Sequence, residues 1–158
     1  MHKKYFSLFA IILCVCLLFS PSLPAYADTP SETEALDDNS ITISTVEEFL
    51  TFSENCRLDS FSKNLSVTLT ADIDLTDVNF DGVPIFYGTF DGGRHRIRGL
   101  NLTSDGSNKG LFRYLEETAY VKNLIVEGTL TPDGSRSNIG GIAGNNAGKI
   151  ENCVFSGY

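Results

Sequence analysis

Four closely spaced aspartates in the middle of the chain raise the question of a calcium site. They are Asp72, Asp74, Asp77 and Asp81. Calcium takes several carboxylate oxygens at once, so a run of acids is a natural place to look for it. The run contains no Asp-x-Asp-x-Asp-Gly, and Asp72 and Asp74 alternate with apolar residues as the outward positions of a strand do. We therefore expect solvated carboxylates here and no metal site.

A basic cluster follows Asp91 and comprises Arg94, His95, Arg96 and Arg98. Polysaccharide lyases combine acidic calcium ligands with an Arg or Lys base that removes a proton from a uronate, and this cluster imitates that arrangement. A lyase, however, needs a long substrate groove and ligands from several neighbouring repeats. We expect His95 to be a turn residue that hydrogen-bonds the next repeat, and we expect no catalysis.

Other catalytic or metal-binding sets find no support in the sequence. His95 is the one histidine outside the N-terminal segment, and the glycines stand at β-turns and not at the start of a helix. Cys56 and Cys153 lie 97 positions apart. We expect two separate buried cysteines, with a disulfide as the alternative. The chain is predicted to have no catalytic, cofactor-binding or metal-binding residues and not to be an enzyme.

Residues 1–27 have the pattern of a cleavable signal peptide. Two lysines precede an apolar run that is too short for a comfortable membrane anchor, and Ala25-Tyr26-Ala27 supplies the small residues that signal peptidase needs. We predict cleavage after Ala27, a secreted or cell-surface location, and no stable membrane span afterwards. A lipoprotein signal at Cys14 or Cys16 is the alternative, although neither cysteine follows a small residue.

The charge of the chain limits its partners. The formal net charge is −8, and it becomes −10 once residues 1–27 are removed. Such a balance argues against nucleic acid and against anionic surfaces held by charge alone. Residues 28–40 are acidic and almost without apolar side chains, which predicts a disordered linker. The fold is expected to occupy residues 41–158 as one domain.

A short amphipathic helix is predicted over residues 45–56. Thr45 is a plausible N-cap, and Glu48 three residues later completes a capping box. Apolar residues follow at spacings of three and four, which builds one apolar face. Beyond this helix, from about residue 65, apolar and polar residues alternate as they do in strands.

Three later segments can be laid over one another, and this repeat predicts the fold. They begin at Gly88, Gly110 and Gly141, and each passes through a turn to an aliphatic residue: Ile97, Val121 and Ile150, which are 24 and 29 positions apart. Short strands joined by Gly, Asn and Asp turns at such a period indicate a solenoid. Because no repeat holds a helix, we predict an all-β fold, a right-handed parallel β-helix with the short N-terminal helix as its cap.

Stacked coils place equivalent residues in ladders about 4.8 Å apart. We expect one ladder of Ile97, Val121 and Ile150 and another of Leu100, Leu124 and Cys153. Gly99, Asn123 and Asn152 are expected to share a register where the chain bends through the left-handed conformation. No second cap follows the last coil, so we expect further coils of a longer chain beyond Tyr158.

These motifs resemble those of a known group of proteins. "LTADIDL" at 69–75, "GTFDG" at 88–92 and "GGIAGNNAGKIENC" at 140–153 are similar to bacterial secreted and surface proteins with the GLUG motif. That group includes the N-terminal regions of immunoglobulin A1-specific metallopeptidases and adhesin-like β-helix proteins. The resemblance implies a non-catalytic β-helical module. The zinc-binding His-Glu-x-x-His of the peptidases does not occur here.

We therefore expect a secreted or cell-surface β-helical module for adhesion, binding or display, with an extracellular protein or glycan as partner. Two alternatives are an accessory N-terminal region of a large secreted metallopeptidase or glycan-active enzyme, and a stand-alone polysaccharide lyase.

Overall fold

A computed structural model describes residues 39–104, 106–131 and 138–158. The predicted signal peptide and nearly all of the predicted linker over 28–40 lie outside these residues. Within them the chain forms one helix and twelve strands. They are β1 Ser40–Ile43, α2 Val46–Asn55, β2 Ser66–Leu69, β3 Ile73–Asp74, β4 Val83–Phe86, β5 Thr89–Asp91, β6 Arg96–Asn101, β7 Phe112–Leu115, β8 Tyr120–Lys122, β9 Ile125–Thr129, β10 Ala143–Asn146, β11 Lys149–Glu151 and β12 Val154–Gly157.

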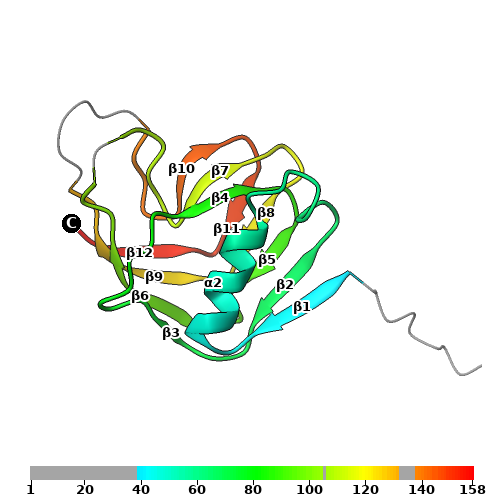
Figure 1. Cartoon of the computed structure of the whole chain (residues 1–158), viewed down its shortest axis with the longest axis horizontal. Coiled ribbons are helices and arrows are strands. Elements are labelled where there is room, and N and C mark those ends of the chain that lie inside the picture. Colours follow the sequence, from blue (N-terminus) through cyan, green and yellow to red (C-terminus); the bar gives the residue numbers. More distant parts are fainter. Residues whose placement is uncertain (1–38, 105, 132–137) are drawn as a thin grey trace, which may run out of the picture. The chain divides into compact units, whose positions relative to one another are not determined.

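The strands form three parallel sheets that the chain visits in turn (Figure 1). The sheets run in the orders β1-β2-β5-β8-β11, β3-β6-β9-β12 and β4-β7-β10. Every named strand pair is parallel, and each strand inside a sheet pairs with its equivalents in the coils before and after it. This arrangement is a parallel β-helix with one short helix, as the repeats predicted.

The interior of the coils is apolar because alternate strand residues point inward. Val67, Phe90 and Val121 lie in register in the first sheet, and each keeps at most 1% of its surface exposed. Phenylalanine rings fill the space between the sheets. Phe86 and Phe90 are in edge contact, and each also lies near Phe112, with ring centroids 5.4 Å apart in both pairs.

α2 covers the interior of the first coil, where it contacts β3 and β4 (Figure 1). The predicted capping box is present: the Thr45 hydroxyl accepts from the Glu48 N–H, and the Glu48 carboxylate accepts from the Thr45 N–H. Phe49 and Phe52 point into the core and are at most 2% exposed. The helix therefore closes one end of the apolar interior, because its buried face takes the place of a further coil.

The predicted ladders are wrong in one coil. Val121 does pair with Ile150, but its partner in the preceding coil is Phe90 and not Ile97. Ile97 lies in a different sheet, where it pairs with Ile73 and Val126. The sequence alignment equated the segments that begin at Gly88 and Gly110, but the first contains β5, which pairs with β8, and the second contains β7, which pairs with β4.

The second ladder is wrong at Leu100 for the same reason, whereas Leu124 and Cys153 lie in register between the pairs of β8 with β11 and of β9 with β12. Leu100 lies opposite Gly128 and not in register with Leu124. A Cβ on Gly128 would stand 2.1 Å from the Leu100 carbonyl oxygen, so only glycine fits at this point. Gly99 sits at a register shift within β6, between Ile97 and Leu100, and not at the bend of Asn123.

The left-handed conformation predicted for these bends is nevertheless present. The φ angles are 53° at Asn123, 52° at Asn152 and 73° at Gly99. Asparagine tolerates this region better than other residues with a Cβ, and glycine has no Cβ to strain. Asn123 and Asn152 mark the same corner of consecutive coils, where the chain passes from the first sheet to the second.

The last coil, β10 to β12, has neighbours on one side within the described residues. Each of its strands stands at the edge of its sheet. Val154 is 55% exposed, and Ile142, Ile150 and Phe155 are only partly buried. Cys153 is likewise half-buried, although it was expected to be buried, whereas Cys56, the C-cap of α2, is fully buried; both are free thiols, as expected.

Candidate functional site

The four aspartates of the predicted acidic run do not converge. Asp72 accepts a hydrogen bond from the backbone N–H of Arg96 at 3.0 Å, which is the main cause of its lowered pKa. Asp74 accepts from Thr76, which lowers its pKa most. Among the described residues, no group of three or more His, Cys, Asp and Glu side chains is placed to hold a metal ion.

The basic cluster is tied to carboxylates of the neighbouring coils. Arg98 pairs with Asp74 at 3.0 Å, and Arg96 pairs with Glu127. His95 Nδ1 lies 3.3 Å from Asp72 Oδ1. The side chain of His95 thus contacts the preceding coil, whereas its backbone carbonyl accepts a hydrogen bond from the Ile125 N–H of the next coil at 3.3 Å, as predicted. These cations bind one coil to another and are not gathered around a space for substrate.

Asp91, the acid next to the basic cluster, fixes a turn. Its carboxylate accepts from the Gly93 N–H at 2.9 Å and from the Asn123 side-chain amide at 3.1 Å, and it pairs with Lys122 at 3.2 Å. Burial raises the pKa of Asp91, but these contacts outweigh burial and hold the pKa below its ordinary value. Asp91 is thus committed to structure and is not a free base.

A buried lysine joins two loops on another side of the coils. Lys109 has 3% of its side chain exposed and donates to Asp81 and, at 2.8 Å, to the Ser104 hydroxyl. Burial of Asp81 acts to raise its pKa, but Lys109 and Ser104 lower it by more. Lys109 therefore fastens the loop that precedes β4 to the loop that follows β6.

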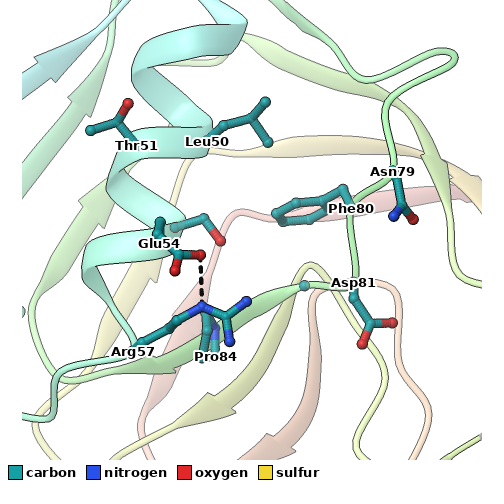
Figure 2. Close-up of a pocket in the computed structure, with 10 residues that line it drawn as sticks. Leu50, Thr51, Glu54, Arg57, Asn79, Phe80, Asp81 and Pro84 are labelled. Atoms are coloured by element: carbon teal, nitrogen blue, oxygen red, sulfur yellow. Dashed lines mark hydrogen bonds and ion pairs between the residues drawn. The ribbon is translucent and has the colours of Figure 1, made fainter.

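Two grooves lie on either side of the segment 79–81. The first, which we call the helix groove, has a volume of about 510 Å³ and lies between α2 and this segment. Figure 2 shows the Phe80 ring directed toward α2, while Asn79 and Asp81 project away from the helix. Glu54 and Arg57 of the groove wall pair with each other at 2.6 Å.

The second groove, which we call the loop groove, has a volume of about 350 Å³ and lies on the other side of the same segment. Polar side chains from two neighbouring coils line it: Asp77 and Asn79 from the loop after β3, and Asn101 and Thr103 from the end of β6 and beyond. All four are exposed.

Sequence reasoning missed this surface. It singled out Asp77 and Asp81 as possible calcium ligands but gave no role to Asn79, Asn101 or Thr103. Asn79 and Asn101 lie in different coils, and the misaligned repeat hid their proximity. The sequence does contain one pattern that points to this surface. In Asp77-x-Asn79-x-Asp81, three polar side chains fall on one side of an extended segment.

Comparisons with known proteins agree with the fold. The family described as the GLUG motif matches residues 135–157, which include β10, β11 and β12. A protein of Evansella cellulosilytica whose name calls it a Gly-rich membrane protein is 34% identical over 96 residues. The alignment covers 53% of this chain and 11% of that protein, so the chain spans about a tenth of its relative. No solved structure matches.

Within the described residues, α2 is the one helix, and it is neither long nor apolar enough to cross a membrane. The family match confirms the resemblance that the motifs of residues 140–153 indicated. The chain thus carries a GLUG motif, which forms the last coil of its parallel β-helix.

Proposed function

We propose that the chain is a non-catalytic β-helical module of a larger bacterial protein, secreted or held at the cell surface, where it binds an extracellular protein or glycan. The observation that carries this proposal is the match of residues 135–157 to the GLUG motif, within a chain that spans about a tenth of a relative named as a membrane protein. Among the described residues, α2 covers the first coil, whereas the strands of the last coil stand at the edges of the three sheets.

The edge strands of the last described coil offer a surface that another strand can pair with. Strand edges with free donors and acceptors pair readily with other strands, and natural proteins cover or charge such edges. Here Val154 is 55% exposed, and Phe155 is only partly buried beside it. A further coil would pair with β10, β11 and β12 and would bury these side chains, as each interior coil does for its neighbour. The length of the Evansella relative is consistent with such a stack.

The pairing of charges supports a module without chemistry of its own. A general base or a metal ligand has to present free oxygens or nitrogens to a substrate or an ion. Asp72, Asp74 and Asp91 instead accept hydrogen bonds from turns and pair with cations of neighbouring coils. The GLUG motif and the relative named as a membrane protein support a surface location.

Protease shaving of intact cells tests the location. The source bacterium is treated with trypsin under conditions that leave the cells whole, and the released peptides are identified by mass spectrometry. We expect peptides from residues 39–158 among the released material or in the medium, with a ribosomal protein as the control that stays inside. If these peptides appear only after the cells are lysed, the proposed function is wrong.

A further inference from the structure

The loop groove contains four polar side chains that the fold does not use. Within the described residues, the side chains of Asp77, Asn79, Asn101 and Thr103 make no hydrogen bond and no ion pair. Some Asp and Asn side chains at other turns, by contrast, hold their own coil or the next. Asp91 accepts from Gly93, and the Asn138 amide donates to Asn108 at 2.8 Å.

These four side chains come from consecutive coils and meet at one groove. Asp77 and Asn79 lie in the loop that leads from β3 to β4, whereas Asn101 ends β6 and Thr103 follows it. The Lys109–Asp81 ion pair joins the same two loops, so it fixes the walls of the groove relative to each other. The groove is therefore a held surface with unused hydrogen-bonding capacity.

The chemistry of the groove disfavours a cation. Of its two carboxylates, Asp81 is already engaged by the buried Lys109 and by Ser104. Asp77 alone remains, whereas calcium takes several charged oxygens together. An amide or a hydroxyl both donates and accepts hydrogen bonds, and so does each hydroxyl of a sugar. The free carboxylate and the charge of −8 repel acidic sugars, which leaves neutral ones.

We propose that the loop groove binds a neutral sugar unit of a glycan, with Asn79, Asn101 and Thr103 exchanging hydrogen bonds with its hydroxyls and Asp77 accepting one. Val78, which is partly buried, also lines the groove and offers apolar contact to the C–H face of the ring. This inference rests on the proposed function as a binding module and names the class of its ligand and the groove that takes it.

A titration followed by amide shifts tests the groove. The purified ¹⁵N-labelled chain is mixed with cellotetraose, maltotetraose, mannotetraose or chitotetraose. At least one of these sugars should shift the amides of Asn79, Asn101 and Thr103. Asn79→Ala and Asn101→Ala should each weaken that affinity by about tenfold, the size expected for one or two lost hydrogen bonds. The matched control is Thr68→Ala, at an exposed position of β2, which should leave the affinity unchanged.

Three results would overturn the inference. They are no shift with any of the four sugars, a sugar affinity that neither asparagine variant changes, and shifts of these amides with calcium chloride but with no sugar. Each variant is first shown to keep the circular dichroism spectrum and melting temperature of the parent chain. A negative result here, together with peptides released by shaving, would reject the glycan groove and leave the surface module standing.

Discussion

Lys109 pairs with Asp81, a residue 28 positions earlier, and this contact fastens the loops of two neighbouring coils to each other. The two partners differ in burial, since 3% of the Lys109 side chain is exposed against 60% of Asp81. The ammonium group is thus the member of the pair that depends on its partner, because a buried charge without a counter-charge is costly.

Asp81→Asn should therefore lower the free energy of unfolding by about 2 kcal/mol. This is less than the effect of breaking a fully buried ion pair, because water still reaches Asp81. Lys109→Met removes the buried charge and should cost less than about 1 kcal/mol. The variant that combines Asp81→Asn with Lys109→Met should lose about as much free energy of unfolding as Lys109→Met alone. Urea unfolding measures all three. A double variant whose loss equals the sum of the single losses would show that the pair is not coupled.

Acid should weaken the contacts between coils. The pKa values of Asp81 and Asp91 lie below their ordinary value of 3.8, because their cationic and hydrogen-bonding partners outweigh burial. A carboxyl with a lowered pKa contributes its full stabilisation above the unfolded pKa and loses it as the pH falls through the folded pKa. The urea midpoint should thus decrease as the pH falls below 3.8.

Asp91→Asn should flatten this decrease, because the amide keeps an acceptor for the turn but does not titrate. Asp59→Asn serves as the control, since Asp59 makes no ion pair within the described residues. A pH profile that Asp91→Asn and Asp59→Asn change equally would contradict the role of Asp91.

Asn123 should be replaceable by glycine but not by alanine. Its φ of 53° puts a Cβ in the left-handed region, which costs alanine roughly 1–2 kcal/mol. Glycine avoids that cost, although, like alanine, it loses the hydrogen bond to Asp91 and the one accepted from Asn152. Asn123→Ala should therefore lower the free energy of unfolding more than Asn123→Gly does. Because both variants lose the side-chain amide, the reverse order in urea unfolding would contradict the role of the left-handed backbone conformation at this position.

The capping role of α2 depends on Phe52. The ring is 2% exposed, and its centroid lies 5.7 Å from that of Phe86 and 5.8 Å from that of Phe90. Phe52→Ala should cost about 3–5 kcal/mol, the usual loss for a buried phenylalanine. Leu58→Ala, at a residue 66% exposed, should change stability by less than about 0.5 kcal/mol. Equal losses for both variants in thermal unfolding would mean that α2 does not pack on the first coil.

The sequence predicted the fold class because a strand repeat with Asn and Gly turns leaves few architectures. The period of two, however, does not show where the chain turns a corner. Val67 and Ile73 belong to one stretch of alternating apolar and polar residues, but they lie in different sheets. Nothing in the alternation shows where the chain bends between them. The helix was also predicted correctly, because its signals are local. The apolar residues follow the helical period, and the capping box joins Thr45 and Glu48, which are only three positions apart.

Register and surface contacts were harder to predict, because they depend on turn lengths. Ile97 was aligned with Val121 because the residues around them are similar, although Ile97 belongs to β6 in the second sheet and Val121 to β8 in the first. The loop groove could not be predicted for the same reason, because Asn79 and Asn101 come close together only when the coils are stacked in the correct register. Lys109 carries no local signal of burial, because its partner Asp81 is distant in sequence.

The uncovered last coil is tested most directly by hydrogen exchange of the purified chain. Amides of β2, β5 and β8 lie between two neighbouring strands and should exchange slowly. In the last coil, the Val154 N–H donates to the Leu124 carbonyl at 2.9 Å and should be partly protected. The coil as a whole has one neighbour, so it should open at a lower free energy than the interior coils. We expect fast exchange beyond Gly141 and slow exchange in β2, β5 and β8. A monodisperse monomer in which β10, β11 and β12 are the most protected strands would contradict the order of the coils and the open edge.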